Sequence, residues 1–145
     1  MLKCQFFLLG KSETSAVHIK PPPKCVPVKV KACRHFYNHT RMPNFLDHRK
    51  LRLAKFSLHI LRGYIKRHVA SCRQPLTLFL CSLFLPKCTE ESNVPALPCR
   101  RLCRRVKQHC KTFFLSLGFT KDDFNCNVFP REKNQSCLKG ILLFN

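Results

Sequence analysis

Cysteine is the residue type in this chain whose number and spacing most clearly indicate chemistry. Ten of the eleven cysteines lie between Cys25 and Cys137, separated in order by 7, 38, 8, 6, 10, 3, 6, 15 and 10 residues. Cysteines at this density either bind a metal or form disulfides, and zinc sites normally contain C-x2-C pairs. The sequence has no such pair, so the spacing favours a disulfide framework and folding in an oxidising compartment. Cys4 lies outside the set.

Groups that could catalyse a reaction are scattered. The seven histidines and seven carboxylates show no paired metal-ligand spacing, and the sequence contains neither a glycine-rich phosphate loop nor an H-E-x-x-H motif. We therefore expect no enzyme activity, no catalytic residue, no metal site and no cofactor.

The charge indicates the class of non-specific partner. Twenty-seven Lys and Arg against seven Asp and Glu give a formal net charge of +20, which favours polyanions. Together with the disulfides, this points to sulfated glycosaminoglycan or an anionic cell surface, and not to nucleic acid. The densest cluster is the predicted polyanion-binding set: Arg100, Arg101, Arg104, Arg105 and Lys107. A solvated surface without a dedicated partner explains the charge equally well.

The chain length of 145 residues suits one small domain. Residues 1–24 read as a leader or linker with a weak or incomplete signal region, because its apolar run covers only residues 6–9. The domain itself is expected at 25–137, followed by a C-terminal tail at 138–145. No uncharged apolar run approaches 20 residues, so no transmembrane helix is predicted.

Hydrophobic periodicity predicts a short edge strand followed by helices. Alternation at Val26, Val28 and Val30 indicates the strand. Helical spacing then extends from Asn44, with Gly63 a point where the helix could split. Its apolar positions are Leu46, Leu53, Phe56, Ile60, Leu61, Tyr64, Ile65 and His68.

Two further helical stretches follow. One runs from Thr77 to Leu85, is apolar on nearly all sides, and is stopped by Pro86. The other begins after Pro98 and ends at Gly118, which suits a C-terminal cap. These elements would have to hold the cysteines in pairing distance.

Five motifs connect the cysteines to a known family. They are Y-N-x-T-x-M-P-N at 37–44, F-L-C-S-L-F-x-P at 79–86, P-C-R-x-L-C at 98–103, G-F at 118–119 and F-P at 129–130. With the ten cysteines, they make 25–137 resemble the frizzled cysteine-rich domain of frizzled receptors and secreted frizzled-related proteins. The resemblance implies a mainly α fold, a small disulfide-stapled helical domain with short N-terminal β-strands.

The resemblance also implies the disulfide pairing, which spacing alone leaves open. The pairs carried over are Cys25–Cys88, Cys33–Cys81, Cys72–Cys110, Cys99–Cys137 and Cys103–Cys126.

In the family this domain binds Wnt proteins, whose acyl chain enters an apolar groove. The matching positions here are Met42, Tyr64, Ile65, Leu83 and Phe84, although each could equally be an ordinary core residue. The chain would then be a receptor ectodomain or a soluble antagonist, secreted or at the cell surface.

Two other functions remain open. The same scaffold could bind heparan sulfate or an anionic membrane surface instead of Wnt, and charge and cysteine density alone also suit a cationic membrane-active defence protein. Two N-glycosylation sequons, at Asn38 and Asn134, agree with an extracellular location.

Overall fold

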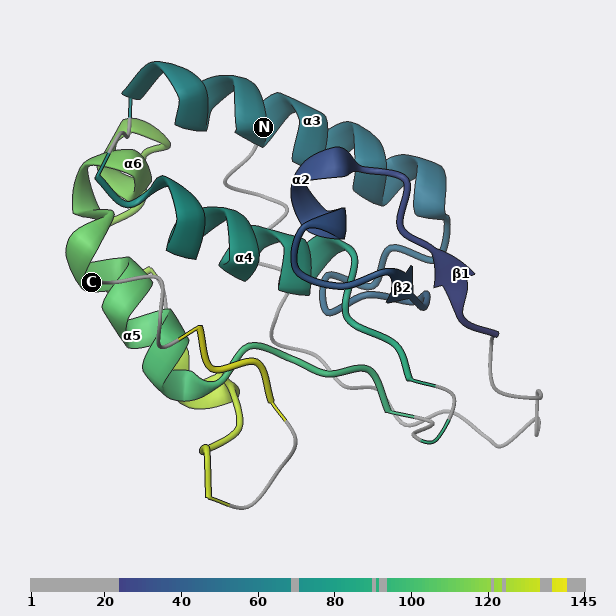
Figure 1. Ribbon diagram of the computed structural model, residues 1–145. Coiled ribbons are helices and arrows are strands. Elements are labelled where there is room, and N and C mark those ends of the chain that lie inside the picture. The colour runs from purple at the N-terminus through teal and green to yellow at the C-terminus, as the bar shows by residue number, and fades with distance from the viewer. Residues whose placement is uncertain are drawn as a thin grey trace.

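The computed structural model describes residues 24–68, 71–89, 91, 94–120, 122–123, 125–133 and 137–140. Helices dominate these residues, and a two-stranded sheet lies near the N-terminal end of the described chain (Figure 1). The mainly helical fold with short N-terminal strands is therefore confirmed. In chain order the elements are β1 (Val26–Pro27), α2 (Lys31–Arg34), β2 (His39–Thr40), α3 (Leu51–His68), α4 (Arg73–Phe84), α5 (Arg100–His109), α6 (Lys111–Ser116) and the 3-10 helix η1 (Cys126–Val128).

The sheet is shorter than the alternating valines suggest. β1 pairs antiparallel with β2, with Val26 opposite Thr40 and Pro27 opposite His39. The chain then turns into the four-residue helix α2 at Lys31, which the sequence did not predict. An isolated bridge from Thr40 to Lys87 connects β2 to the segment after α4.

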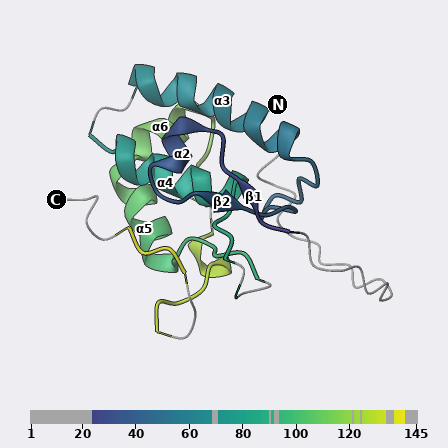
Figure 2. The same ribbon diagram turned by 45° about the vertical axis from the view of Figure 1, so that its right-hand side comes forward.

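α4 is the central helix. Nine of its twelve residues are buried, and it packs against α3, α5 and α2 (Figures 1 and 2). It begins at Arg73, four residues before the predicted start, and accommodates Pro75 in its first turn, where no intrahelical N–H bond is lost. Its burial on several sides agrees with its apolar sequence.

α3 differs from the prediction in three respects. It begins at Leu51, since residues 42–50 form a loop, and it continues through Gly63 without splitting. The third difference concerns the buried face, which carries Ala54, Leu58 and Leu61 against α4. Three of the apolar residues that define the predicted stripe lie exposed on the outer side: Leu53, Phe56 and Ile60.

The last predicted helix is divided into α5 and α6. The break falls at Cys110, whose backbone leaves the helical region at φ −104° and ψ 26°. Leu102 and Val106 of α5 and Phe113 of α6 face the core. Gly118 follows with φ +79°, the left-handed conformation expected of a glycine after a helix end.

Five disulfides tie these elements together, and they are the pairs that the resemblance implies. Two hold α4: one joins it to α2, and the other joins its N-terminal boundary to the α5–α6 junction. A third joins α5 to η1. The bonds are Cys25–Cys88, Cys33–Cys81, Cys72–Cys110, Cys99–Cys137 and Cys103–Cys126.

The first part of the predicted tail packs on the domain. The Leu138 N–H donates to the carbonyl of Leu97, and the Leu138 carbonyl accepts from Cys99 N–H. A Cβ at Gly140 would lie 3.0 Å from side-chain atoms of both Leu102 and Leu78, so the backbone approaches the core closely there. Residues 141–145 lie outside the described residues.

The Y-N-x-T-x-M-P-N segment holds the C-terminal end of α4. The Tyr37 hydroxyl donates to the Leu85 carbonyl at 2.8 Å, and Asn44 Nδ2 donates to the neighbouring Phe84 carbonyl at 3.0 Å. Asn44 Oδ1 accepts from the backbone N–H groups of Leu46 and His48. The motif thus satisfies helix-end carbonyls that have no intrahelical partner.

His48 completes this network and must be neutral in it. Asn44 Nδ2 lies 3.0 Å from His48 Nδ1; since an amide nitrogen only donates, Nδ1 accepts. The imidazole stacks on Phe84, with ring centroids 5.8 Å apart. Burial lowers the pKa of His48 below its ordinary value, and the charge of Asp47 only partly opposes this.

We expect the free energy of unfolding to fall as the pH drops below about 6.5, the pKa of histidine in the unfolded chain. Unfolded His48 takes up a proton there, whereas folded His48 resists it until lower pH. Urea denaturation between about pH 7.5 and pH 5 measures the slope. His48→Gln should flatten the slope, because the Gln side chain takes up no proton in this range. Equal slopes for wild type and His48→Gln would contradict this account.

Candidate functional site

Four of the five predicted groove residues are divided between two helix ends. Tyr64 and Ile65 lie in the last turns of α3, before the connection to α4, whereas Leu83 and Phe84 are the last two residues of α4. Since α4 rises about 1.5 Å per residue, this end lies more than a helical turn away from the connection. The length of α4 therefore separates Tyr64 and Ile65 from Leu83 and Phe84.

Their exposure also differs. Ile65, Leu83 and Phe84 are at most 3% exposed and belong to the core. Met42 and Tyr64 are half-buried and pack against that core. A ligand approaching from solvent would therefore meet Met42 or Tyr64 first.

The surface next to Tyr64 is cationic. Arg67 lies over the Tyr64 ring, with the guanidinium carbon 5.7 Å from the centroid, and its Nε donates to the Gly63 carbonyl at 3.2 Å. Lys66 and Arg67 are both exposed. Their charged ends can stay in water while their methylene stems lie along the apolar surface.

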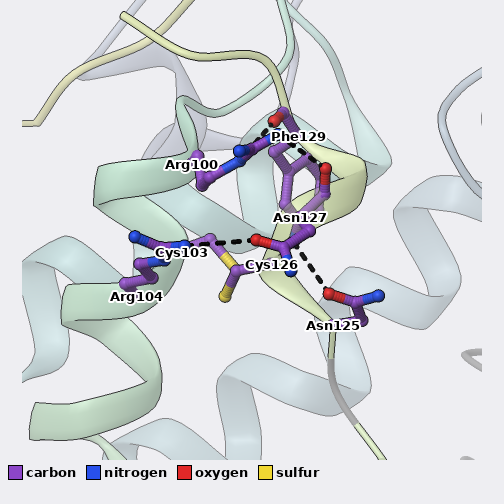
Figure 3. The surroundings of a disulfide bond; sticks show 7 residues. All are labelled: Arg100, Cys103, Arg104, Asn125, Cys126, Asn127 and Phe129. Carbon is purple, nitrogen blue, oxygen red and sulfur yellow. Dashed lines mark hydrogen bonds between the residues drawn. A yellow bond between two sulfur atoms is a disulfide. The ribbon is translucent and has the colours of Figure 1, made fainter.

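The predicted polyanion-binding set is split by its own hydrogen bonds (Figure 3). Arg100 donates from Nε to the Phe129 carbonyl at 3.1 Å and from Nη2 to the Asn127 carbonyl at 2.8 Å. Arg104 donates to Asn127 Oδ1 at 3.2 Å. Arg101 instead faces Glu132 at 3.8 Å. The first role of Arg100 is thus to hold η1 against α5, beside the Cys103–Cys126 bond.

Arg104 and Lys107 border a cavity that the sequence did not predict. Its volume is about 430 Å³. The apolar lining comes from Phe114, Leu115 and Phe119. The rim is cationic, with Lys111 at the start of α6 completing it. The spacing of Arg104 and Lys107 was the available signal, because residues three apart share a helix face. Arg105 is half-buried and does not line this cavity.

The two predicted N-glycosylation sites are Asn38 and Asn134. Asn38 is exposed, just before β2, and its backbone carbonyl accepts from Val28 N–H. A glycan on its side chain would not disturb that bond. Asn134 lies outside the described residues.

No group of three or more His, Cys, Asp or Glu side chains among the described residues could hold a metal ion. No helix in the same residues is long and apolar enough to cross a membrane.

Comparisons with known proteins agree on one family. A family model described as the Fz domain matches residues 25–133. Frizzled-4 of Homo sapiens is 33% identical over 121 residues, covering 81% of this chain and 22% of that protein. Frizzled-10 of Homo sapiens is 32% identical over 117 residues, covering 79% and 20%. The chain thus spans about a fifth of the length of these curated relatives.

Among solved structures, the selenomethionine-labelled crystal structure of the Smoothened CRD is similar. It has a TM-score of 0.49 and 22% sequence identity, and the match covers 81% of this chain and 95% of that one.

Breaking the Cys103–Cys126 bond should expose a thiol and destabilise the domain. We expect Cys103→Ser to leave Cys126 free and to lower the free energy of unfolding by about 2–4 kcal/mol. Thiol titration before and after unfolding, with urea denaturation, tests both effects. Cys103→Ser/Cys126→Ser should show the lower stability without the new thiol. A Cys103→Ser protein without an additional reactive thiol would contradict this pairing.

Proposed function

The chain belongs to the Fz domain family, and we propose that it acts as an extracellular module that binds Wnt proteins through their acyl chain. The observation that carries this proposal is the family match over 25–133 together with five disulfides built from the family's ten cysteines. The predicted membership itself is confirmed. Membership also agrees with a non-enzymatic role.

Location and domain limits are part of the same proposal. Disulfides persist outside the cell, so the module would be secreted or displayed at the cell surface, as a receptor ectodomain or a soluble antagonist. We propose a leader or linker at 1–24 and a folded module that begins at residue 25 and includes, beyond Cys137, the packed residues Leu138 and Gly140 of the predicted 138–145 tail. Glycans would be attached at Asn38 and Asn134.

The acyl chain supplies the binding energy in this proposal. Each methylene removed from water contributes about 0.8 kcal/mol. Tyr64 is the residue of the predicted groove at which the chain would first lie, since it is half-buried at the end of α3. Ile65, the next residue of α3, is 3% exposed, so contact with it requires side chains to move.

The residues after Tyr64 bring positive charge to the end of α3. Tyr64-Ile65 is followed by Lys66-Arg67-His68. Because Lys66 and Arg67 are exposed, their charges need not enter an apolar groove. We propose that they border the acyl site and narrow the range of ligands that fit.

Binding to an acylated Wnt protein should exceed binding to its non-acylated form by at least tenfold. Biolayer interferometry at about 0.15 M salt, with excess heparin to suppress charge-driven binding, measures the ratio. Tyr64→Ser should lower affinity for the acylated form only. Val128→Ser, at an exposed position on η1, is the matched control. Equal binding of both Wnt forms would reject acyl recognition.

Heparan sulfate is a second candidate ligand. The observation that favours it is the cationic rim of Arg104, Lys107 and Lys111, because the described residues that line the cavity include no carboxylate. Sulfate groups along a chain could contact these residues in succession.

If heparan sulfate binds there, Arg104→Ser/Lys107→Ser should elute from heparin at clearly lower salt than wild type. The matched control is Arg49→Ser/Lys50→Ser, which removes the same charge from two exposed positions. The control should elute close to wild type. Equal shifts for both variants would mean that net charge alone controls retention, and elution of wild type near 0.15 M salt would also count against this ligand.

A further inference from the structure

The outer face of α3 carries large apolar side chains that the core does not use. Leu53 is 46% exposed, Phe56 63% and Ile60 39%. Their spacing of three and four residues places them in one stripe along the helix. The opposite face already packs on α4 through Leu58 and Leu61, both fully buried. The stripe therefore has no role in the core of the domain.

Basic residues flank this stripe, without acidic neighbours in sequence. Arg52 and Lys66 of α3 are exposed, and Lys55 and Arg62 are half-buried. The sequence contains no Asp or Glu between Asp47 and Glu90. The outer face of α3 thus combines positive charge with apolar area.

A surface hollow beside Phe56 extends the cationic region to the neighbouring helix. Its volume is about 510 Å³. Lys29 and Lys31, before and at the start of α2, face Lys55 and Arg62 of α3 across it. His59 and Val30 also line it. Both ribbon views show α2 beside α3 (Figures 1 and 2). Two elements therefore present cations around one exposed aromatic ring.

We propose that this face docks onto a bilayer containing anionic phospholipid. Leu53, Phe56 and Ile60 enter the boundary between headgroups and acyl chains, as the apolar face of an interfacial helix does. Lys29, Lys31, Lys55 and Arg62 contact lipid phosphates around Phe56. α3 then lies parallel to the membrane surface, and its buried face stays on α4.

The combination of side chains selects this partner over others. A soluble polyanion would contact the cations and leave three large apolar side chains in water. A second copy of the chain would bring two bodies of formal charge +20 together, and like charges repel. An anionic bilayer offers negative headgroups and an apolar layer within about 5–10 Å of each other.

Vesicle co-sedimentation of the oxidised full chain tests the proposal at about 0.15 M salt. We expect binding to phosphatidylcholine vesicles with about 30% phosphatidylserine, and little binding to phosphatidylcholine alone. Phe56→Ser should weaken binding about tenfold, as loss of one buried aromatic side chain would. Val128→Ser, which removes a 48% exposed apolar residue from η1, should stay within about twofold of wild type. Equal losses in both variants would overturn the proposal.

Two charge-reversal variants separate the effect of charge at the α3 site from the effect of the protein's net charge. Lys55→Glu and Lys133→Glu change the net charge equally, but only Lys55 borders the hollow. Lys55→Glu should weaken vesicle binding several-fold more than Lys133→Glu does. Equal effects would mean that the whole protein's charge drives binding, and the α3 site would be rejected. Thermal unfolding followed by circular dichroism verifies that each variant is folded.

The chain contains no tryptophan, so the fluorescence of a single introduced tryptophan reports whether that position inserts into the bilayer. Phe56→Trp should show blue-shifted emission and protection from acrylamide when phosphatidylserine vesicles are added. Val128→Trp should show neither. Heparin binding distinguishes a membrane from a soluble polyanion. The membrane proposal fails if heparin binds wild type and Phe56→Ser equally and vesicles leave the emission of Phe56→Trp unshifted. The ligand of this face would then be a soluble polyanion.

Discussion

The burial of α4 is the constraint on which the rest of the structure depends. Phe79, Leu80 and Leu83 are at most 1% exposed, so α3, α5 and α2 must surround this helix. A domain of this size buries limited apolar surface, and disulfides compensate by restricting the unfolded chain. Cys33–Cys81 and Cys72–Cys110 act near the two ends of α4. The cysteine spacing therefore reflects the need to enclose one apolar helix.

The same constraint explains the motif at 37–44. A buried helix end leaves carbonyl groups that water cannot reach, and each requires a donor. Tyr37 and Asn44 donate to the consecutive carbonyls of Leu85 and Phe84. Burial strongly raises the pKa of the Tyr37 phenol, so the hydroxyl keeps its proton and remains a donor. A motif that identifies the family thus has a structural role in this chain.

The sequence predicted which helices exist better than it predicted their buried sides and their first and last residues. The apolar composition of α4 and the prolines near its ends made its existence and burial predictable, whereas the break at Cys110 has no local signal. α3 has apolar residues on both sides, and small residues such as Ala54 and Ser57 on the buried side carry little hydrophobic signal. Packing against α4 decided which side faces inward. The groove residues were assigned from their match to the family's motifs. A motif gives the type of each residue but not its position in space, so the separation of Tyr64 from Phe84 could not be foreseen.

Two kinds of surface follow from this arrangement: the half-buried Tyr64 end of α3, and its outer apolar and basic face. Both depend on α4 being held in place by the five disulfides. The most direct measurement of that framework is mass-spectrometric mapping of the non-reduced, protease-digested full chain. The account predicts that Cys33 is linked to Cys81 and Cys72 to Cys110, with the remaining three pairs as in the structure. A peptide linking Cys81 to any cysteine other than Cys33 would contradict it.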